Sequence, residues 1–583
     1  MMLQAIFAVV PCDKAFVTCA RAQQRPAPVL PDSSQSYCLP IDMEPFLAGN
    51  FGEIRNNHFH AGLDFKTQST VDHPVYAFAD GYVHRADINA YGYGLCLYIR
   101  HPQLGLTSVY AHLNSFSDYI FNNVRAKQVE LELNNAQLTF EPNALPVRKG
   151  EVIALSGNTG SSGGPHVHFE LRDCNDEDDE FFNPMPFFRD RIADRKPPRA
   201  SHIYLYPLGG VACGSRSRQS AQVITVQSGK RTINRKFTAW GRVGVGLKAY
   251  DYMENQSNSY GIYRTRLFVD DKLIYDMCED RFFYSERRAA NTVTDFSAWQ
   301  TQRSMINKSF VESGNKLRMI DHSLGDGTIN IDEERVYRLR YVLTDAHGNE
   351  SDVNFEITGK RTTLTEHDPL NGNGLAVRCL EGADFDSAGF SIHIEPEALY
   401  TDQNVRIRIS SRVNQENHDV SKICVIGDPS VPIHSSIELS IPIPQAYSDT
   451  LTNPEQLYVA TPDGRYIGGK VVPGKSGCSS VVKCNIREFG SYVVRRDKSK
   501  PSASFVTLGW NKAQISVADT GSGIDRFKVF IDGKFVPFDQ NRYGSRLSKP
   551  RDFGIEKGRN HDIRIWLIDK CGNEQVIETR KYF

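Results

Sequence analysis

The chain has 583 residues, a length at which about three to five domains of ordinary size are expected. Its 68 Lys and Arg residues nearly balance its 69 Asp and Glu residues, so the net charge of -1 gives no electrostatic reason to expect nucleic acid as a partner. No run approaches the roughly 18 consecutive apolar residues that a membrane span requires, which predicts a mature chain without a transmembrane segment.

The first 42 residues are predicted to be a leader followed by a linker. Within residues 1–23, Ala20, Arg21 and Ala22 have the small-x-small form of a cleavage site, although polar residues and a proline interrupt the apolar stretch before them. The sequence therefore predicts an exported protein of the periplasm or cell envelope, with an unstructured leader that has no export role as the alternative. Residues 24–42, which begin with a tract rich in Pro, Ser and Gln, are predicted to be the linker.

Residues 43–195 are predicted to form an antiparallel β-sheet domain. Short apolar runs separated by glycine turns indicate its strands. These strands are expected at residues 74–78, 81–83, 95–100, 107–112, 152–155 and 166–171. Residues 117–133 instead carry apolar residues at about helical spacing. They lie within a long insertion, residues 114–146, that either restricts a cleft or acts as a movable lid.

The remaining chain is predicted to be rich in strands throughout, so the fold class is mainly β. A proline-marked boundary after Arg195 begins a β-sandwich (Ig-like) module at residues 196–362. A β-rich domain is predicted at residues 363–497, and a second β-sandwich module at residues 498–583.

The two predicted modules share a repeated pattern, Asp-x-x-Gly-Asn-Glu, which spans residues 345–350 in the first and 569–574 in the second. The pattern is typical of a turn in which the aspartate caps backbone amides and the glycine takes a positive φ. We therefore interpret the modules as copies of one unit and the pattern as a turn. A metal-binding role for Asp345 and Asp569 is the alternative.

Cysteine is not expected to bind a metal, because none of the 12 cysteines belongs to a Cys-x-x-Cys pair. Cys478 and Cys484 are close enough in sequence to form a disulfide in an oxidising compartment. Free, buried thiols are the usual state of such scattered cysteines.

Three short segments of the N-terminal domain bring together five histidines and a carboxylate. They are residues 57–65, 109–113 and 164–170. Because residues two or four apart on an extended strand face the same way, we expect His60 with Asp64, and His166 with His168, to point into one cavity. Two imidazoles and one carboxylate are a typical catalytic zinc set, which leaves the fourth position open for a water molecule. Zinc lowers the pKa of such a water to about 7 and polarises a substrate carbonyl, so amide hydrolysis is expected.

These segments resemble the lysostaphin-type (LytM-like) zinc metallopeptidases, a family of peptidoglycan endopeptidases. The shared pattern is His-x-x-x-Asp, then a lone histidine in a Tyr-x-His-Leu context, then His-x-His followed by an aromatic and an acidic residue. The resemblance covers residues 43–190. It implies one zinc ion per chain, bound by His60, Asp64 and His168. It also implies that His112 and His166 are the acid/base and transition-state-stabilising pair.

Three features near this pattern have competing interpretations. His58 also forms a His-x-His with His60, so the pattern could be shifted by two residues, but only His60 has a carboxylate four positions later. Glu170 either orients a metal ligand or is a solvated or salt-bridged strand carboxylate. The glycine-rich residues 157–164 lack the Gly-Lys-Ser/Thr ending of a phosphate-binding loop, so we predict a turn that places the His-x-His strand.

The predicted function is zinc-dependent hydrolysis of peptide cross-links or stem peptides of peptidoglycan by a metal-activated water. Residues 196–583 are expected to bind the wall or an envelope protein partner, or to serve as a spacer. Two alternatives stay open at this point. One is a catalytically silent binding or scaffold protein of the cell envelope, and the other is a zinc peptidase that acts on proteins.

Overall fold

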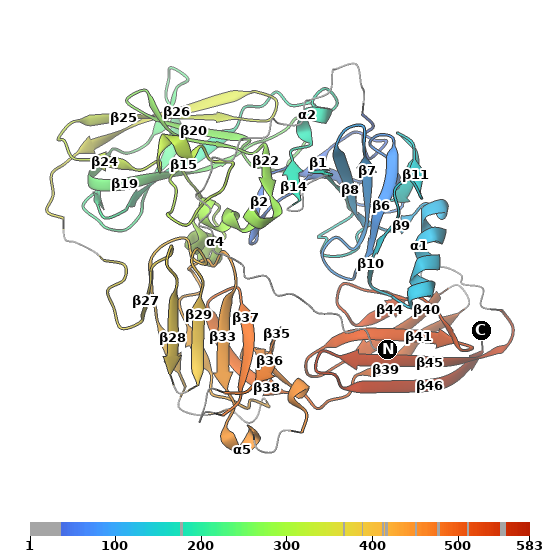
Figure 1. Cartoon of the computed structure of the whole chain (residues 1–583). Helices are drawn as coiled ribbons and strands as arrows, with labels where there is room; N and C mark the ends of the chain where they lie inside the picture. Colours follow the sequence, from blue (N-terminus) through green and yellow to red (C-terminus); the bar gives the residue numbers. More distant parts are fainter. Residues whose placement is uncertain are drawn as a thin grey trace, which may run out of the picture. The chain divides into compact units, whose positions relative to one another are not determined.

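The structure is a computed structural model of the chain. It describes residues 37–174, 179–364, 368–387, 389–410, 413, 418–448, 452–474, 479–509, 512–548 and 556–582. The predicted leader, most of the predicted linker and Cys478 lie outside these residues. Strands dominate the described part (Figure 1), which confirms the prediction of a mainly β fold. Among the described residues, no helix is long and apolar enough to cross a membrane.

The N-terminal domain is built around one antiparallel sheet, drawn mainly in blue in Figure 1. Its central strands follow the order β1-β4-β13-β8-β7-β6-β10. Their bounds are β1 (Leu47–Gly49), β4 (Leu63–Lys66), β6 (Gly81–Ile88), β7 (Leu95–His101), β8 (Leu106–Leu113), β10 (Ala136–Thr139) and β13 (His166–Asp173). Every residue of β8 is buried, because both faces of this central strand are covered. Side chains on β8 and its neighbour β13 are therefore held in fixed positions.

Shorter strands complete the domain. They are β2 (Ile54–Arg55), β3 (His58–Phe59), β5 (Pro74–Tyr76), β9 (Ser115–Phe116), β11 (Pro146–Val147), β12 (Val152–Leu155) and β14 (Glu180–Phe182). β2 pairs with β3, and β12 pairs with both β5 and β9. Each of the six strands predicted for this domain is thus present, as β5, β6, β7, β8, β12 and β13.

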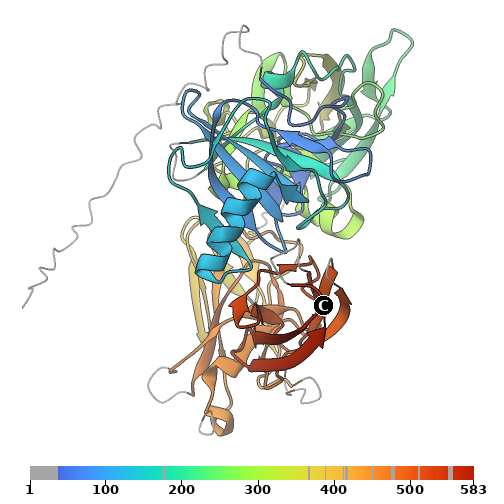
Figure 2. The same ribbon diagram turned by 90° about the vertical axis from the view of Figure 1, so that its right-hand side faces the viewer.

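The insertion at residues 114–146 contains the predicted helix, α1 (Asp118–Leu131). Figure 2 shows α1 beside the blue strands of the N-terminal domain. Its buried face includes Ile120, Phe121 and Val124. The strands that follow it, β10 and β11, both pair with β6. Backbone hydrogen bonds therefore fasten the second half of the insertion to the edge of the sheet.

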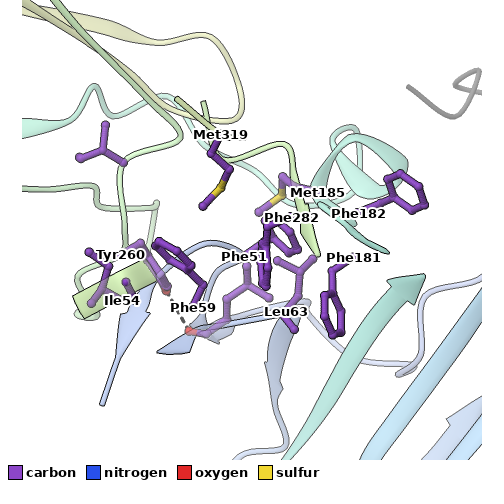
Figure 3. Close-up of a cluster of buried hydrophobic side chains, with 14 of the residues drawn as sticks. Phe51, Ile54, Phe59, Leu63, Phe181, Phe182, Met185, Tyr260, Phe282 and Met319 are labelled. Carbon is purple, nitrogen blue, oxygen red and sulfur yellow. Dashed lines mark hydrogen bonds between the residues drawn. The ribbon is translucent and has the colours of Figure 1, made fainter. Parts of the chain in front are cut away.

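The N-terminal domain and the segment after it share one hydrophobic core. Figure 3 shows Phe51 and Phe282 within this cluster, and their ring centroids are 5.2 Å apart. Phe282 belongs to β22 (Arg281–Phe283), which pairs with β14 and so extends the N-terminal sheet. Each such buried aromatic contributes about 1.5–3 kcal/mol. The boundary predicted at residue 195 therefore crosses a continuous core and a shared sheet.

The two segments predicted to be repeats contain sheets with the same strand order. The order is β21-β20-β25-β26 in the first and β42-β41-β45-β46 in the second. The bounds are β20 (Arg264–Val269), β21 (Lys272–Cys278), β25 (Val336–Thr344), β26 (Glu350–Gly359), β41 (Ile524–Ile531), β42 (Lys534–Phe535), β45 (Asn560–Asp569) and β46 (Glu574–Tyr582). The Asp-x-x-Gly-Asn-Glu pattern forms the turn between the last two strands in both copies. Gly348 and Gly572 have φ values of 89° and 79°, as expected for that turn.

In the first segment β26 also pairs with β19 (Phe237–Tyr250), and this pairing is parallel, whereas the other pairings of the described strands are antiparallel. Residues 363–497 form two five-stranded sheets, ordered β28-β29-β33-β37-β36 and β31-β32-β38-β34-β35. Their bounds are β28 (Ala383–Ser387), β29 (Phe390–Ile394), β31 (Ile407–Ile409), β32 (Cys424–Ile426), β33 (Ile437–Pro442), β34 (Leu457–Ala460), β35 (Tyr466–Gly468), β36 (Lys470–Val472), β37 (Val481–Ile486) and β38 (Gly490–Arg496). A single core cluster takes residues from both sheets, for example Leu439 and Val494. The predicted domain boundaries and the Ig-like description of the modules stay predictions.

Candidate metal centre

Three ligand atoms converge in the middle of the N-terminal sheet. Asp64 on β4 lies opposite His168 on β13 in the antiparallel register, and His60 lies in the loop before β4. His60 Nε2 is 3.0 Å from Asp64 Oδ1 and 3.0 Å from His168 Nδ1, and the last two atoms are 2.8 Å apart. Tetrahedral zinc with bonds of about 2.0–2.1 Å holds its ligand atoms roughly 3.3 Å apart. The three atoms, slightly closer together than this, can all contact one metal ion after a small outward shift.

Hydrogen bonds around the centre fix which ring nitrogens carry a proton. His60 Nδ1 lies 2.6 Å from the Asn50 carbonyl oxygen, and His168 Nε2 lies 2.7 Å from Glu170 Oε1. These oxygens accept, so the two nitrogens donate, and neutral rings then turn the lone pairs of His60 Nε2 and His168 Nδ1 toward Asp64. Two lone pairs and a carboxylate oxygen in mutual contact repel one another unless a cation lies between them. The donor set fits a divalent metal ion.

The charges at the centre agree with this fit. Burial opposes ionisation of Asp64, but His60 and hydrogen bonds from the neighbouring imidazoles hold the pKa of Asp64 well below its usual range. Burial likewise opposes protonation of His168, yet Asp64 and Glu170 raise the pKa of His168 to about 9. In the metal-free chain a proton therefore takes the position of the cation. Arg55 Nη2 donates to Asp64 Oδ2 at 3.0 Å, which leaves Oδ1 for the metal.

Glu170 is the anchor behind His168. It is fully buried, and its Oε2 forms an ion pair with Arg172 Nη2 at 2.7 Å. Tyr93 donates to Glu170 Oε1 at 2.5 Å, and its ring stacks on His168. Burial alone would raise the pKa of Glu170, but Arg172 and His168 lower it to about 2. Both sequence-based interpretations of Glu170 therefore describe it in part, since it contacts a metal-ligand candidate and also lies in a salt bridge.

His112 and His166 lie beside the three ligand candidates. His112 Nδ1 is 2.9 Å from the Thr159 carbonyl oxygen, and His166 Nδ1 is 2.8 Å from the Gly164 carbonyl oxygen. Each Nδ1 therefore donates, which leaves each Nε2 available to accept a proton. The two rings are 4.8 Å apart, and His166 Nε2 lies 3.4 Å from Asp64 Oδ1. Burial, and next His168 and His166, lower the pKa of His112 to about 3, so its imidazole is neutral at pH 7.

The loop that precedes His166 supports the second pair. Thr159, within the glycine-rich residues 157–164, accepts from His112 through its carbonyl and donates to the Leu113 carbonyl through its hydroxyl. This agrees with the predicted positioning turn. Sequence reasoning did not assign a site role to Thr159, Tyr93 or Arg172. The available signal was an acidic residue, Glu170, within an apolar strand, because a buried carboxylate requires partners.

His58 lies outside the group. Its side chain is exposed, and its Nδ1 contacts the Asn56 carbonyl oxygen at 2.9 Å. Gly62, between His60 and Asp64, has a different role, because a Cβ atom there would lie 2.1 Å from the Phe169 carbonyl oxygen. Only glycine lets the chain approach β13 this closely, and this approach brings His60 and Asp64 up to His168.

The Glu170→Gln variant is expected to bind the metal about 10–100-fold more weakly, the usual cost of losing an outer partner of a histidine ligand. Glutamine keeps the volume and one acceptor but removes the charge that both His168 and Arg172 contact. Competition with a chelator of known affinity measures the effect. Glu130→Gln, on the exposed face of α1, is the matched control, and equal metal affinity in the two variants would contradict the assigned role.

Comparison with known proteins shows which families parts of this chain match. Residues 58–129 match Peptidase family M23, and residues 376–497 match the Zu5-like domain. An uncharacterized metalloprotease of Haemophilus influenzae is 38% identical over 112 residues, which are 19% of this chain and 18% of that protein. The DD-carboxypeptidase/endopeptidase Mpg of Neisseria meningitidis is 34% identical over 113 residues, 19% of this chain and 20% of that protein.

Among solved structures, the catalytic domain of lysostaphin from Staphylococcus simulans is 22% identical, with a TM-score of 0.19. The alignment covers 25% of this chain and 92% of that one. The chain spans about a fifth of the length of the curated relatives it matches. The M23 match includes His60, Asp64 and His112. Residues 58–129 of this chain therefore contain a Peptidase family M23 domain, as the resemblance to the lysostaphin-type metallopeptidases predicted.

Proposed function

We propose that this chain is a zinc-dependent endopeptidase of the periplasm or cell envelope that hydrolyses peptide cross-links or stem peptides of peptidoglycan. The observation that supports this most strongly is the contact among His60 Nε2, Asp64 Oδ1 and His168 Nδ1, in which two imidazole lone pairs and a carboxylate oxygen meet. The substrate class is supported by the similarity to Mpg, whose name describes a carboxypeptidase and endopeptidase.

Zinc fits these donors better than a hard cation does. Imidazole nitrogen suits zinc, whereas calcium and magnesium prefer oxygen ligands throughout. Three protein ligands are also typical of a catalytic zinc site, in contrast with the four of a structural site. Zinc bound there would lower the pKa of a water molecule and polarise the scissile carbonyl.

The residues of the chain then have separate tasks. Arg55 and Glu170 hold Asp64 and His168 in place through the contacts described above. His112, neutral at pH 7, accepts a proton through Nε2 as the amide is attacked. His166, whose Nε2 faces the same cavity, donates to the developing oxyanion or to the leaving amine once that nitrogen has taken up a proton.

Hydrolysis of purified peptidoglycan sacculi tests the proposal. The purified protein is expected to release new peptide ends, to lose this activity when a chelator removes the metal, and to regain it when zinc is restored. Casein and oligoglycine serve as parallel substrates. Faster cleavage of casein and oligoglycine than of wall peptides would indicate a zinc peptidase that acts on proteins. If the zinc-loaded protein cleaved none of these substrates, the chain would be a catalytically silent scaffold of the envelope.

A further inference from the structure

A second group of ligand atoms lies where the N-terminal domain joins the segment after it. Asp194, Asp345 and His347 each place one ligand atom within 4.8 Å of the other two. Asp194 follows α2 (Met185–Phe188), whereas Asp345 and His347 belong to the turn between β25 and β26. The side chain of Asp194 has no exposed surface, and that of His347 is 9% exposed. The group is therefore closed to solvent, unlike an accidental cluster of surface acids.

Two buried atoms of this group face each other without a hydrogen bond between them. His347 Nε2 lies 2.8 Å from the Ile192 carbonyl oxygen, so it donates, and the neutral ring has its lone pair on Nδ1. His347 Nδ1 and Asp194 Oδ2 are both buried, and neither has a hydrogen-bond partner in the described structure. They are 3.8 Å apart, which is too far for a hydrogen bond. A cation between them would satisfy both atoms.

The turn interpretation accounts for Asp345 but not for these two atoms. Asp345 Oδ1 accepts from the backbone amides of His347 and Asn349 at 2.8 and 2.9 Å, and Oδ2 accepts from Asn349 Nδ2 at 2.7 Å. A carboxylate offers about four lone-pair positions, so Asp345 retains capacity for a cation. Asp251, which is 3% exposed, has an Oδ1 atom that is also without a partner. The charges of Asp194 and Asp345 act on Asp251, but it does not belong to the group whose ligand atoms lie within 4.8 Å of one another.

The second copy of the module has a corresponding group, Asp497, Asp519 and Asp569, in which no histidine takes part. Asn349 Nδ2 donates to the Asp194 carbonyl oxygen, and Asn573 Nδ2 donates in the same way to that of Asp497. In the second copy, however, Asp497 Oδ2 accepts from the Ser522 amide at 2.6 Å. Asp194 Oδ2 has no such donor. An unpartnered oxygen on this particular aspartate is therefore found in the first copy, where His347 also lies, whereas in the second copy the buried oxygen without a partner is Asp519 Oδ1.

We propose that Asp194 Oδ2, Asp345 and His347 Nδ1 bind a divalent cation of the zinc or manganese class. One imidazole among carboxylates suits these ions, since imidazole suits zinc and carboxylates suit manganese. Because the group is closed to solvent, the role of the ion is structural. The ion would join the end of the N-terminal domain to the β25–β26 turn. The single zinc ion predicted from the sequence belongs to the peptidase centre, and this ion is additional to it.

Metal titration of a variant without the peptidase centre tests the proposal. The full chain with His60→Ala and Asp64→Ala is stripped with a chelator and titrated separately with Zn2+, Mn2+ and Ca2+ by calorimetry. We expect one equivalent of Zn2+ or Mn2+ to bind. Addition of His347→Ala is expected to abolish this equivalent, whereas His202→Ala, a partly buried histidine on β15 (Arg199–Pro207), is expected to leave it intact.

Crystals of the unaltered protein soaked in Mn2+ give a second reading that does not depend on how the variants fold. An anomalous peak bonded to Asp194 and His347 is expected. Absence of that peak, binding of Ca2+ alone, or an equivalent that persists in the His347→Ala protein would overturn the proposal. These outcomes are independent of peptidase activity, so either proposal can fail without the other.

Discussion

Replacing Asp64 with alanine is expected to remove the metal ion of the peptidase centre and, with it, peptidoglycan hydrolysis. Asp64 Oδ1 contacts both imidazole ligand candidates, at 3.0 and 2.8 Å. Loss of an outer partner already costs about 10–100-fold in metal affinity or activity, so loss of a ligand is expected to cost more than about 100-fold. Elemental analysis of the purified variant and an assay on sacculi measure the two effects.

Asp42→Ala is the matched control for this variant, because Asp42 is an exposed aspartate immediately before the predicted N-terminal domain. It is expected to retain both zinc and activity. Circular dichroism separates loss of metal from loss of fold. A folded Asp64→Ala protein with undiminished zinc content and turnover would show that the carboxylate is not a ligand.

The His112→Ala variant is expected to keep its metal and to lose turnover by about 10²–10⁴-fold, the usual contribution of a general acid or base. The ring of His112 lies beside the rings of His166 and His168. Its Nδ1 donates to the Thr159 carbonyl oxygen. It therefore contributes a proton-transfer atom and no metal bond. Zinc content and kcat are measured on the same preparation.

His58→Ala is the control for this second variant. His58 is a histidine of the same segment as His60, but its side chain is exposed and contacts the Asn56 carbonyl oxygen. Its removal is expected to change neither zinc content nor kcat. Loss of zinc in His112→Ala would indicate that His112 is a metal ligand. Loss of activity in His58→Ala would favour the alternative in which the motif is shifted by two residues.

The strands of the N-terminal domain could be predicted because their patterns are local. Apolar runs bounded by glycine turns placed β5, β6, β7, β8, β12 and β13, and helical spacing placed α1. The pairing of His166 with His168 also follows from a local rule, since both lie on β13 and residues two apart share a face. A local pattern is enough to predict a feature when all of its residues lie on one strand.

The relation of His60 to Asp64 was predicted for a reason that is incomplete. The two were expected to face one way along a single strand, but β4 begins at Leu63, and His60 lies in the loop before it. Backbone bonds of His60 with Gly52 and Glu53 hold that loop. Asp64 meets His168 through the register between β4 and β13. The sequence of neither strand alone determines a pairing between two strands that are far apart in the chain.

The groups that fix the ring tautomers could not be predicted for the same reason. The Thr159 carbonyl is 47 residues from His112, and Tyr93 is 77 residues from Glu170. Contributions of this kind depend on the folded path of the chain and not on residue type. The addition of β22 to the N-terminal sheet is a further case, because its partner β14 lies about a hundred residues earlier and the proline-marked boundary falls between them.

The most direct test of the zinc centre is anomalous scattering from crystals of the purified protein, measured on both sides of the zinc absorption edge. The result we predict is a peak about 2.0–2.2 Å from His60 Nε2, Asp64 Oδ1 and His168 Nδ1, with His112 and His166 too far away to coordinate it. A zinc-loaded, hydrolytically active protein whose anomalous peak lies elsewhere would contradict the account.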